Sequence, residues 1–558
     1  MTDFNPTEFN LADVFDTVAS TIPDTECIVW RDRRLTYADV AERSNRFACF
    51  LAENGLGCHT ERADLAGSES GQDQLALYLT NGNEYVEAMI GSYKARVAPF
   101  NVNYRYVAEE LRYLLDNSTA AAVVYGASFA PVLAEVLDDL SRLKLLIQVD
   151  DDDGATGLLP GAHAYEDIVT GSDGSRPDVA VSPDDLYILY TGGTTGMPKG
   201  VLWRQADIYV AAMGGRPIGG SEELADYDAL AQSASNAPGA VKMMCVPPFM
   251  HGASQWAMFN TFTGGGTLLI QNEVRRLDAA DVLATAAREG AITLLSVGDA
   301  IGRPLIEEME RGAHDLSSLM VLVNGGAVLN STLKDRAIAA VDGLMVYDAV
   351  GASETGAQMT HFSTAGEAAS SGTFQPGPDT VVVDADLSRV LEPGEDATGW
   401  LAQRGRVPLG YLGDADKTAR TFPVVGGVRF AIPGDRARIG ADGIIELLGR
   451  DSVTINSGGE KIFAEEVEQS IAHHPAVYDV VVVGRPSERW GSEVVALVQI
   501  HDDMEATAED LAVEAAKHVA RYKLPKDFIF LPALQRSPAG KADYRWARTV
   551  AEGKSANG

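Results

Sequence analysis

Over its first 350 residues the chain alternates short apolar runs with stretches of helical periodicity, and this alternation restricts the folds open to it. The runs at 120–126 (AAAVVYG) and 144–150 (KLLIQVD) are typical of buried strands, and apolar residues recur at helical spacing between them. The runs at 292–298 and 320–326 repeat the pattern. Strand–helix–strand repetition favours α/β layers with parallel strand pairing. The sequence therefore predicts an α/β protein.

The pattern changes further along the chain. Residues 381–405 combine short strands with turn residues, which is typical of a small barrel or meander. After residue 451 we expect a compact unit with helices at 465–473 and 507–520 and strands at 478–483 and 494–500. A length of 558 residues has room for several domains at about 150 residues each.

The composition argues against several classes of partner and site. With 79 acidic and 45 basic residues the net charge is −34, which disfavours nucleic acid and anionic membrane surfaces. The four cysteines show no C-x-x-C spacing, so we expect no zinc site and no disulfide scaffold. The first residues lack a basic, apolar leader, and prolines and glycines interrupt the longest uncharged window, 243–272. We expect a cytoplasmic protein without a membrane-spanning segment.

Residues 186–200 read LYILYTGGTTGMPKG, an apolar strand that runs into a loop of glycine, threonine and one lysine. Glycines let successive backbone N–H groups surround an anion, and threonine hydroxyls add donors. The loop is not a Walker A motif, because Pro198 precedes Lys199 and Gly200 follows it. The segment predicts a polyphosphate site, and a flexible surface loop is the alternative.

Residues 190–200 resemble the phosphate loop of the adenylate-forming superfamily, which includes acyl-CoA synthetases, luciferases and peptide-synthetase adenylation domains. The resemblance covers nearly the whole chain and continues in the order of the family at 350–356 (VGASETG), 399–422, 431–439, 449–468 and 536–545. It implies a large N-terminal domain at 1–451, with two α/β subdomains and a small β-barrel. A small, mobile α+β domain at 452–558 is implied to follow.

The resemblance implies that a carboxylic acid and ATP give an acyl-adenylate and pyrophosphate, and that coenzyme A then takes the acyl group as a thioester. One anion attacks another, so catalysis consists of positioning and charge neutralisation. A general base is not required, and the sequence contains neither a G-x-S-x-G nor an H-E-x-x-H motif. The implied cofactors are ATP, Mg²⁺ and coenzyme A, and a homodimer stays open.

By resemblance, three residues carry the catalysis. Lys541, in SPAGKAD, would reach the α-phosphate and the substrate carboxylate as a compact charge on a flexible stem. Glu354 would hold Mg²⁺ as a hard oxygen ligand, and Lys199 would contact the phosphates. Without the motif context, Lys541 and Glu354 would be ordinary surface residues. The residues implied to bind ATP or CoA are Thr191, Gly192, Gly193, Thr194, Thr195, Gly196, Lys199, Gly325, Gly326, Ala327, Ser353, Asp435, Arg450, Ser457, Gly458 and Gly459.

Within this set the resemblance implies separate roles. Asp435 and Arg450 would contact the ribose hydroxyls, although Pro-Gly-Asp is also ordinary turn chemistry. Residues 325–327 would line the adenine site by close backbone approach. Asp451 would be the hinge between the domains, and the segment 457–461 (SGGEK) would move in to meet the pantetheine arm of CoA.

The acyl pocket is implied to lie at His251, Gly325, Gly351 and Ala352, with a buried core histidine as the alternative for His251. No aspartate accompanies His251 in PFMHGAS, which disfavours an α-amino acid substrate. The small residues leave room for a long or bulky acyl group. The sequence around the two lysine motifs looks similar to actinobacterial fatty acid and steroid side-chain CoA ligases, with aryl acids as the second choice. The chain ends 17 residues after Lys541, so free CoA is the expected acceptor, and a carrier protein is the alternative.

Overall fold

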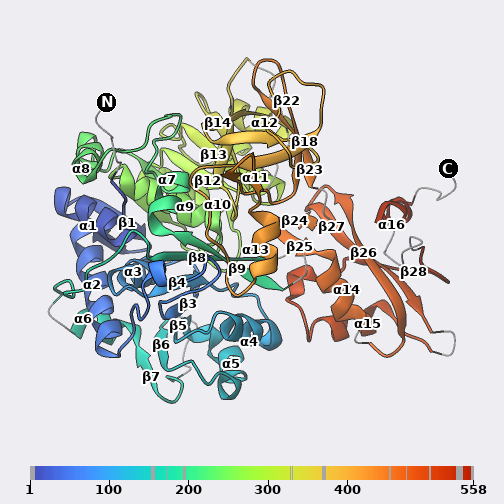
Figure 1. Ribbon diagram of the computed structural model, residues 1–558, viewed down its shortest axis with the longest axis horizontal. Coiled ribbons are helices and arrows are strands. Elements are labelled where there is room, and N and C mark those ends of the chain that lie inside the picture. The colour runs from blue at the N-terminus through green and yellow to red at the C-terminus, as the bar shows by residue number, and fades with distance from the viewer. Residues whose placement is uncertain are drawn as a thin grey trace.

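The computed structural model describes residues 7–151, 157–171, 174–192, 197–326, 329, 331–366, 372–450, 454–472, 474–501, 504–535 and 544–553. Two large sheets with their helices form the N-terminal part, and a smaller sheet with its own helices forms the C-terminal domain (Figure 1). This arrangement confirms the α/β fold with a large first and a small second domain.

The first sheet has eight strands in the order β19-β9-β8-β4-β3-β5-β6-β7. The predicted strands at 120–126 and 144–150 are β5 and β6, and they pair in parallel, as expected. The strands are β3 (Gln74–Tyr78), β4 (Ala98–Asn101), β5 (Ala122–Gly126), β6 (Leu145–Val149), β7 (Ala162–Ala164), β8 (Leu186–Gly192), β9 (Pro198–Arg204) and β19 (Gly410–Tyr411).

The second sheet has thirteen strands, and its first part in the chain is mainly parallel. The predicted strands at 292–298 and 320–326 are β12 and β13, which also pair in parallel. This part consists of β1 (Glu26–Trp30), β2 (Arg33–Thr36), β10 (Lys242–Cys245), β11 (Thr267–Ile270), β12 (Thr293–Ser296), β13 (Val321–Gly325) and β14 (Met345–Ala352).

An antiparallel part continues the second sheet beyond β14. The short strands expected at 381–405 are present, but their hydrogen bonds join them to the large sheet through β15, β16 and β23. Its strands are β15 (Gly356–Ser363), β16 (Thr373–Pro376), β17 (Thr380–Val383), β18 (Gly399–Gln403), β22 (Asp435–Ile439) and β23 (Ile445–Arg450), beside the small hairpin of β20 (Val424–Val425) and β21 (Val428–Arg429).

The main core lies between the two large sheets. Helix α3 passes through it, and all 12 of its residues are buried. Leu75 and Leu77 of the first sheet and Leu268 and Ile270 of the second belong to one apolar cluster. The helices of the N-terminal part are α1 (Leu11–Thr21), α2 (Tyr37–Glu53), α3 (Asn83–Lys94), α4 (Ala108–Asn117), α5 (Ala130–Ala134), α6 (Tyr165–Gly171), α7 (Gln205–Ala212), α8 (Tyr227–Asn236), α9 (Gly252–Thr263), α10 (Ala279–Glu289), α11 (Gly298–Glu310), α12 (Ser331–Ala340) and α13 (Ala415–Thr421).

Helix α10 shows how the local sequence sets these boundaries. The Asp278 carboxylate accepts the Asp281 N–H at the first turn, and Gly290 ends the helix at φ +68°, where glycine is unstrained. Val282, Leu283 and Ala286 are buried at helical spacing, so one face packs against the sheet.

The C-terminal domain has a separate five-stranded sheet and its own apolar core, which includes Ile455, Val482 and Leu511. The helix predicted at 507–520 is shorter than expected, since α15 ends at Ala515 and the chain then turns to bury Val519 and Ala520. The elements are β24 (Thr454–Ser457), β25 (Glu460–Phe463), α14 (Ala464–Ala472), β26 (Val477–Ser487), β27 (Gly491–Ile500), α15 (Ala508–Ala515), β28 (Asp527–Phe530) and α16 (Tyr544–Ala551).

Within the part of the chain that the structure describes, no helix has both the length and the apolar character needed to cross a bilayer.

Candidate active site

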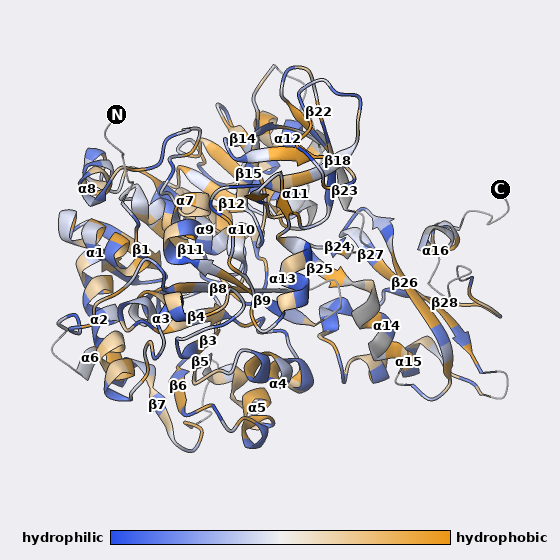
Figure 2. Cartoon of the chain, viewed as in Figure 1, coloured by the Kyte–Doolittle hydropathy of each residue, from blue (hydrophilic) through white to orange (hydrophobic). Residues whose placement is uncertain are grey.

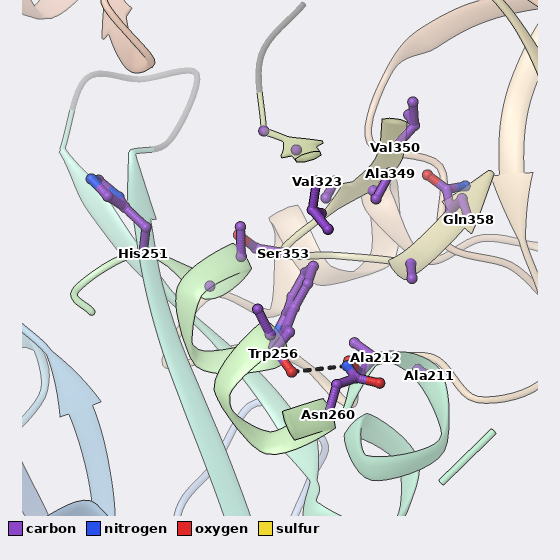
Figure 3. A pocket seen from close by; sticks show the side chains of 18 of the residues that line it. Ala211, Ala212, His251, Trp256, Asn260, Val323, Ala349, Val350, Ser353 and Gln358 are labelled. Carbon is purple, nitrogen blue, oxygen red and sulfur yellow. Dashed lines mark hydrogen bonds between the residues drawn. The ribbon is translucent and has the colours of Figure 1, made fainter. Parts of the chain in front are cut away.

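A cavity of about 690 Å³ lies where the two large sheets meet the C-terminal domain. Its walls come from the carboxyl ends of β8, β13 and β14, from the start of α9 and from the turn before β25. In open parallel sheets, ligands bind at the carboxyl ends of the strands. The cavity (Figure 3) therefore lies where a fold of this kind binds its ligand.

The two ends of the predicted phosphate loop pair with each other in the hairpin that β8 and β9 form. Thr191 pairs with Lys199 and Gly192 with Pro198, and Thr191 lines the cavity. Lys199 makes an ion pair with Asp414, the residue that caps α13. Burial alone would raise the pKa of Asp414, but the hydrogen bonds from Lys199 and from the Lys417 N–H outweigh it and lower the pKa. Gly193, Thr194, Thr195 and Gly196 lie outside the described residues.

Glu354 lies in the tight turn that joins β14 to β15. Its carboxylate is buried, and the Tyr411 hydroxyl donates a hydrogen bond of 2.7 Å to Oε1. The Trp203 indole N–H donates to the Ser353 carbonyl at 2.9 Å, and the Thr355 hydroxyl accepts the Ala352 N–H at 3.0 Å. Two aromatic side chains thus fix the turn, and Ser353 faces the cavity.

The residues predicted for the nucleotide base and ribose are only partly brought together. Gly325 and Gly326 line the cavity at the end of β13, and Gly326 has φ +78°, a conformation that favours glycine. Asp435 and Arg450 are paired in the backbone register of β22 and β23, but Asp435 is not among the residues that line the cavity. Ala327 lies outside the described residues.

All four residues predicted for the acyl pocket line the cavity: His251, Gly325, Gly351 and Ala352. The His251 side chain is 35% exposed, which excludes the alternative of a buried core histidine. From there the cavity continues past Tyr347, Val350 and Met359 to the loop at 216–221. It therefore extends well beyond the four residues that were predicted for the acyl pocket.

The C-terminal domain closes one side of the cavity with Gly459, Glu460, Tyr522 and Lys523. Glu460 pairs with Arg105, and its Oε1 lies 3.4 Å from Nε2 of His251. Burial would raise the pKa of Glu460, but the charges of His251 and Arg105 hold it at about 2. A Cβ on Gly459 would come within 2.9 Å of Val297, so only glycine allows this close approach.

The two residues that precede Gly459 in the predicted segment 457–461 are held by backbone contacts. Ser457 pairs with Gly491, and the Gly458 N–H donates to the Trp490 carbonyl at 2.9 Å. Lys541 and Asp451 lie outside the described residues.

A second contact between the domains was not predicted from the sequence. Lys523 Nζ lies 2.6 Å from Glu110 Oε1, and both side chains are almost fully buried. The Asn103 amide donates to the Tyr522 hydroxyl at 2.8 Å, and His518 Nδ1 lies 2.7 Å from a carboxylate oxygen of Glu109. These residues belong to no recognisable motif.

The far wall of the cavity was also missed. The string GGRPIGG at 214–220 indicates a turn, because glycine and proline cluster there, but nothing in it points to a binding surface. The structure places Arg216, Pro217 and Ile218 of this loop on the cavity, together with residues 375–378.

Comparisons with known proteins agree with this geometry. The family model described as AMP-binding enzyme matches residues 15–412, and the model of the AMP-binding enzyme C-terminal domain matches residues 466–541. The chain is 56% identical over 545 residues to the medium-chain acyl-CoA ligase Mig of Mycobacterium avium, with 98% of each chain covered. It is 37% identical to the 3-oxocholest-4-en-26-oate–CoA ligase of Rhodococcus rhodochrous, with 97% of this chain and 95% of the relative covered.

Solved structures show the same fold. The amide bond synthetase McbA of Marinactinospora thermotolerans superposes with a TM-score of 0.77 at 20% identity, covering 96% of this chain and 99% of that chain.

Proposed function

The chain belongs to the AMP-binding enzyme family, and from this premise we propose that it activates an apolar carboxylic acid with ATP and passes the acyl group to CoA. It is an AMP-forming acyl-CoA ligase, as its identity to two such ligases over nearly the whole chain supports. One observation carries the proposal. A single cavity joins the base of the phosphate loop to a long, largely apolar space, and the C-terminal turn at 459–460 forms part of its rim.

The catalytic groups are assigned as follows. Lys541 neutralises charge between the carboxylate and the α-phosphate, and Lys199 and Thr191 hold the phosphates at the hairpin tip. Glu354 supplies a hard oxygen ligand for Mg²⁺, whose other ligands would be phosphate oxygens and water. The Tyr411 hydroxyl holds the Glu354 carboxylate in place next to Ser353, which lines the cavity, and a carboxylate held in this way fits the role. Bound Mg²⁺ would neutralise phosphate charge.

The docked position of the C-terminal domain belongs to the thioester step. It brings Gly459 and Glu460 to the cavity beside His251, where the thiol of CoA would have to enter. Adenylation would instead place Lys541 at the α-phosphate, so the domain would turn about Asp451, the boundary between 1–451 and 452–558. In both steps Asp435 and Arg450 would hold the ribose.

The acid is of the medium- to long-chain or steroid side-chain type. Two features support this class: the cavity has mostly aliphatic and aromatic walls beyond Gly351, and relatives at 56% and 37% identity carry the names of ligases for such acids. The four cysteines are free thiols, which suits a reducing cytoplasm, where ATP and CoA are available.

The test is a panel of straight-chain acids from hexanoic to octadecanoic acid, with benzoic acid, assayed with ATP, Mg²⁺ and CoA. We expect AMP, pyrophosphate and the acyl-CoA ester in equal amounts, with the highest kcat/KM on an aliphatic acid. An enzyme that acylates only a holo-carrier protein, or that prefers benzoic acid, would contradict the proposal.

A further inference from the structure

The wall of the cavity carries a buried hydrogen-bond donor that has nothing to bind. Gln358, on β15, lines the cavity and is 3% exposed. Its amide nitrogen Nε2 has no hydrogen-bond partner among the residues that the structure describes. A buried donor without an acceptor is unfavourable, because it loses its bond to water and gains no other. The group is therefore matched to an acceptor that arrives with a ligand.

The neighbours of Gln358 bind its amide oxygen and its backbone carbonyl. The Thr355 hydroxyl lies 3.0 Å from Oε1 of Gln358, the shortest of its three contacts with acceptors. The Gln358 backbone carbonyl accepts bonds from the Gly377 N–H at 2.7 Å and from the Thr380 hydroxyl at 2.8 Å. Backbone and amide oxygen are thus held, and Nε2 is the atom left for a ligand.

The position of this donor separates it from the reacting end of the cavity. Figure 3 shows Gln358 and His251 on opposite sides of the cavity, with Val323 and Val350 on the way between them. The turn that binds the Gln358 carbonyl leads into Asp379, which pairs with Arg216 at 3.2 Å. The Nε of Arg216 is also buried without a partner in the described part of the chain, so this end of the cavity holds a second unpaired donor.

We propose that Gln358 Nε2 donates a hydrogen bond to an oxygen carried within the acyl group, so that the enzyme favours acids with a carbonyl or ether oxygen remote from the carboxylate. The inference rests on the proposed function, since it assumes that the acyl group occupies this cavity. A site built to bind a polar atom discriminates against the analogue that lacks it, because the buried group then stays unpaired.

The experiment compares dodecanoic acid with a series of oxododecanoic acids, each with one keto group at a different position, in the wild type and in Gln358→Met. Methionine keeps the length of the side chain and removes the donor. When the keto group lies at a position that Gln358 can reach, kcat/KM for the keto acid, divided by kcat/KM for dodecanoic acid, should fall about 10-fold in the variant. A change of this size corresponds to the loss of one neutral hydrogen bond. We expect the change in KM and not in kcat.

Gln271→Met is the matched control. Gln271 is also a buried glutamine with one unpartnered amide atom, but it does not line the cavity. In Gln271→Met, the ratio of kcat/KM for the keto acid to kcat/KM for dodecanoic acid should equal that of the wild type. A ratio in Gln358→Met that is unchanged at every position, or a loss that is equal for all acids, would overturn the inference.

A measurement on the wild type alone guards against a variant that does not fold. The infrared stretch of a ¹³C-labelled keto group should shift to lower wavenumber when the favoured isomer binds, as it does on accepting a hydrogen bond. No shift for any isomer overturns the inference. Turnover of dodecanoic acid without any effect of a keto group would leave the proposed ligase intact, whereas no CoA ester from any acid would refute the ligase itself.

Discussion

The two sides of the active-site cavity are held by different forces. On the N-terminal side, the walls are strand ends and helices anchored in one continuous apolar core that both large sheets share. On the C-terminal side, the contacts with described partners are mainly polar: Glu460 with Arg105, Lys523 with Glu110, and His518 with Glu109. Figure 2 shows the hydrophobic strands inside each domain.

The difference indicates which side can move. Separating an apolar interface exposes its surface to water at about 25 cal/mol per Å², whereas an ion pair that separates regains hydration at both charges. The first side is therefore a permanent wall, and the second is a contact that can form and break. An enzyme with two half-reactions in one cavity needs this combination.

The largest expected effect concerns Lys541, which is proposed to act in the adenylation step. Lys541→Ala should lower acid-dependent exchange of pyrophosphate into ATP about 100- to 1000-fold, the range for removing one group that stabilises transition-state charge. Lys517→Ala, an exposed lysine of the same domain, is the control and should behave as the wild type. Unchanged exchange in Lys541→Ala would refute its assigned role.

The next effect concerns the buried ion pair. Lys523→Met leaves Glu110 without its partner in the docked position, which costs about 3 kcal/mol, or roughly 100-fold in docking. We expect thioester formation to fall by this factor and pyrophosphate exchange to stay unchanged. Adding Glu110→Gln should restore much of the loss, because the isolated charge is then gone. An equal loss in both half-reactions would show that the contact serves stability alone.

A smaller effect tests the rigidity of the permanent wall. Tyr411→Phe removes the hydrogen bond of 2.7 Å to the Glu354 carboxylate. A bond to a charged group contributes about 1.5 kcal/mol, so the Mg²⁺ concentration for half-maximal adenylation should rise on the order of 10-fold. In the matched control Tyr93→Phe, the lost hydroxyl has no partner in the described chain, and no change is expected. If both variants need the same Mg²⁺ concentration, the assignment of Glu354 fails.

The smallest effect is a flat pH profile. Because His251 and Arg105 hold the pKa of Glu460 at about 2, its contribution to docking is complete above the ordinary carboxyl range and is lost only as the pH falls toward 2. Between pH 5 and 8, Glu460 therefore stays ionised, and Glu460→Gln should slow thioester formation a few-fold at every pH in this range. An acidic limb in this range that is present in the wild type and absent in Glu460→Gln would contradict the account.

Local pattern was enough to predict the strands β5, β6, β12 and β13 and their parallel pairing, because buried parallel strands are continuous apolar runs. It did not predict that the strands at 381–405 join the second sheet, since hydrogen bonds between distant strands leave no mark in either strand. The end of α15 was missed for a related reason: tertiary contacts after Ala515 outweigh helix propensity.

Motifs pointed to one part of the cavity wall and not to another. Thr191, Ser353, Gly325 and His251 line the cavity, and they were singled out because glycine-rich turns and their neighbours keep a recognisable order. Gln358 and Lys523 were not singled out, because a glutamine or a lysine has many uses, and the roles proposed for them rest only on burial and on their partners.

The central claim is that one cavity serves two steps with two positions of the C-terminal domain. Its most direct test is single-turnover thioester formation from synthetic dodecanoyl-adenylate and CoA, set beside pyrophosphate exchange in the same preparations. Lys541→Ala should form the thioester at the wild-type rate while exchange is lost, and Lys523→Met should show the reverse. Two variants that lose both steps in proportion would contradict the claim.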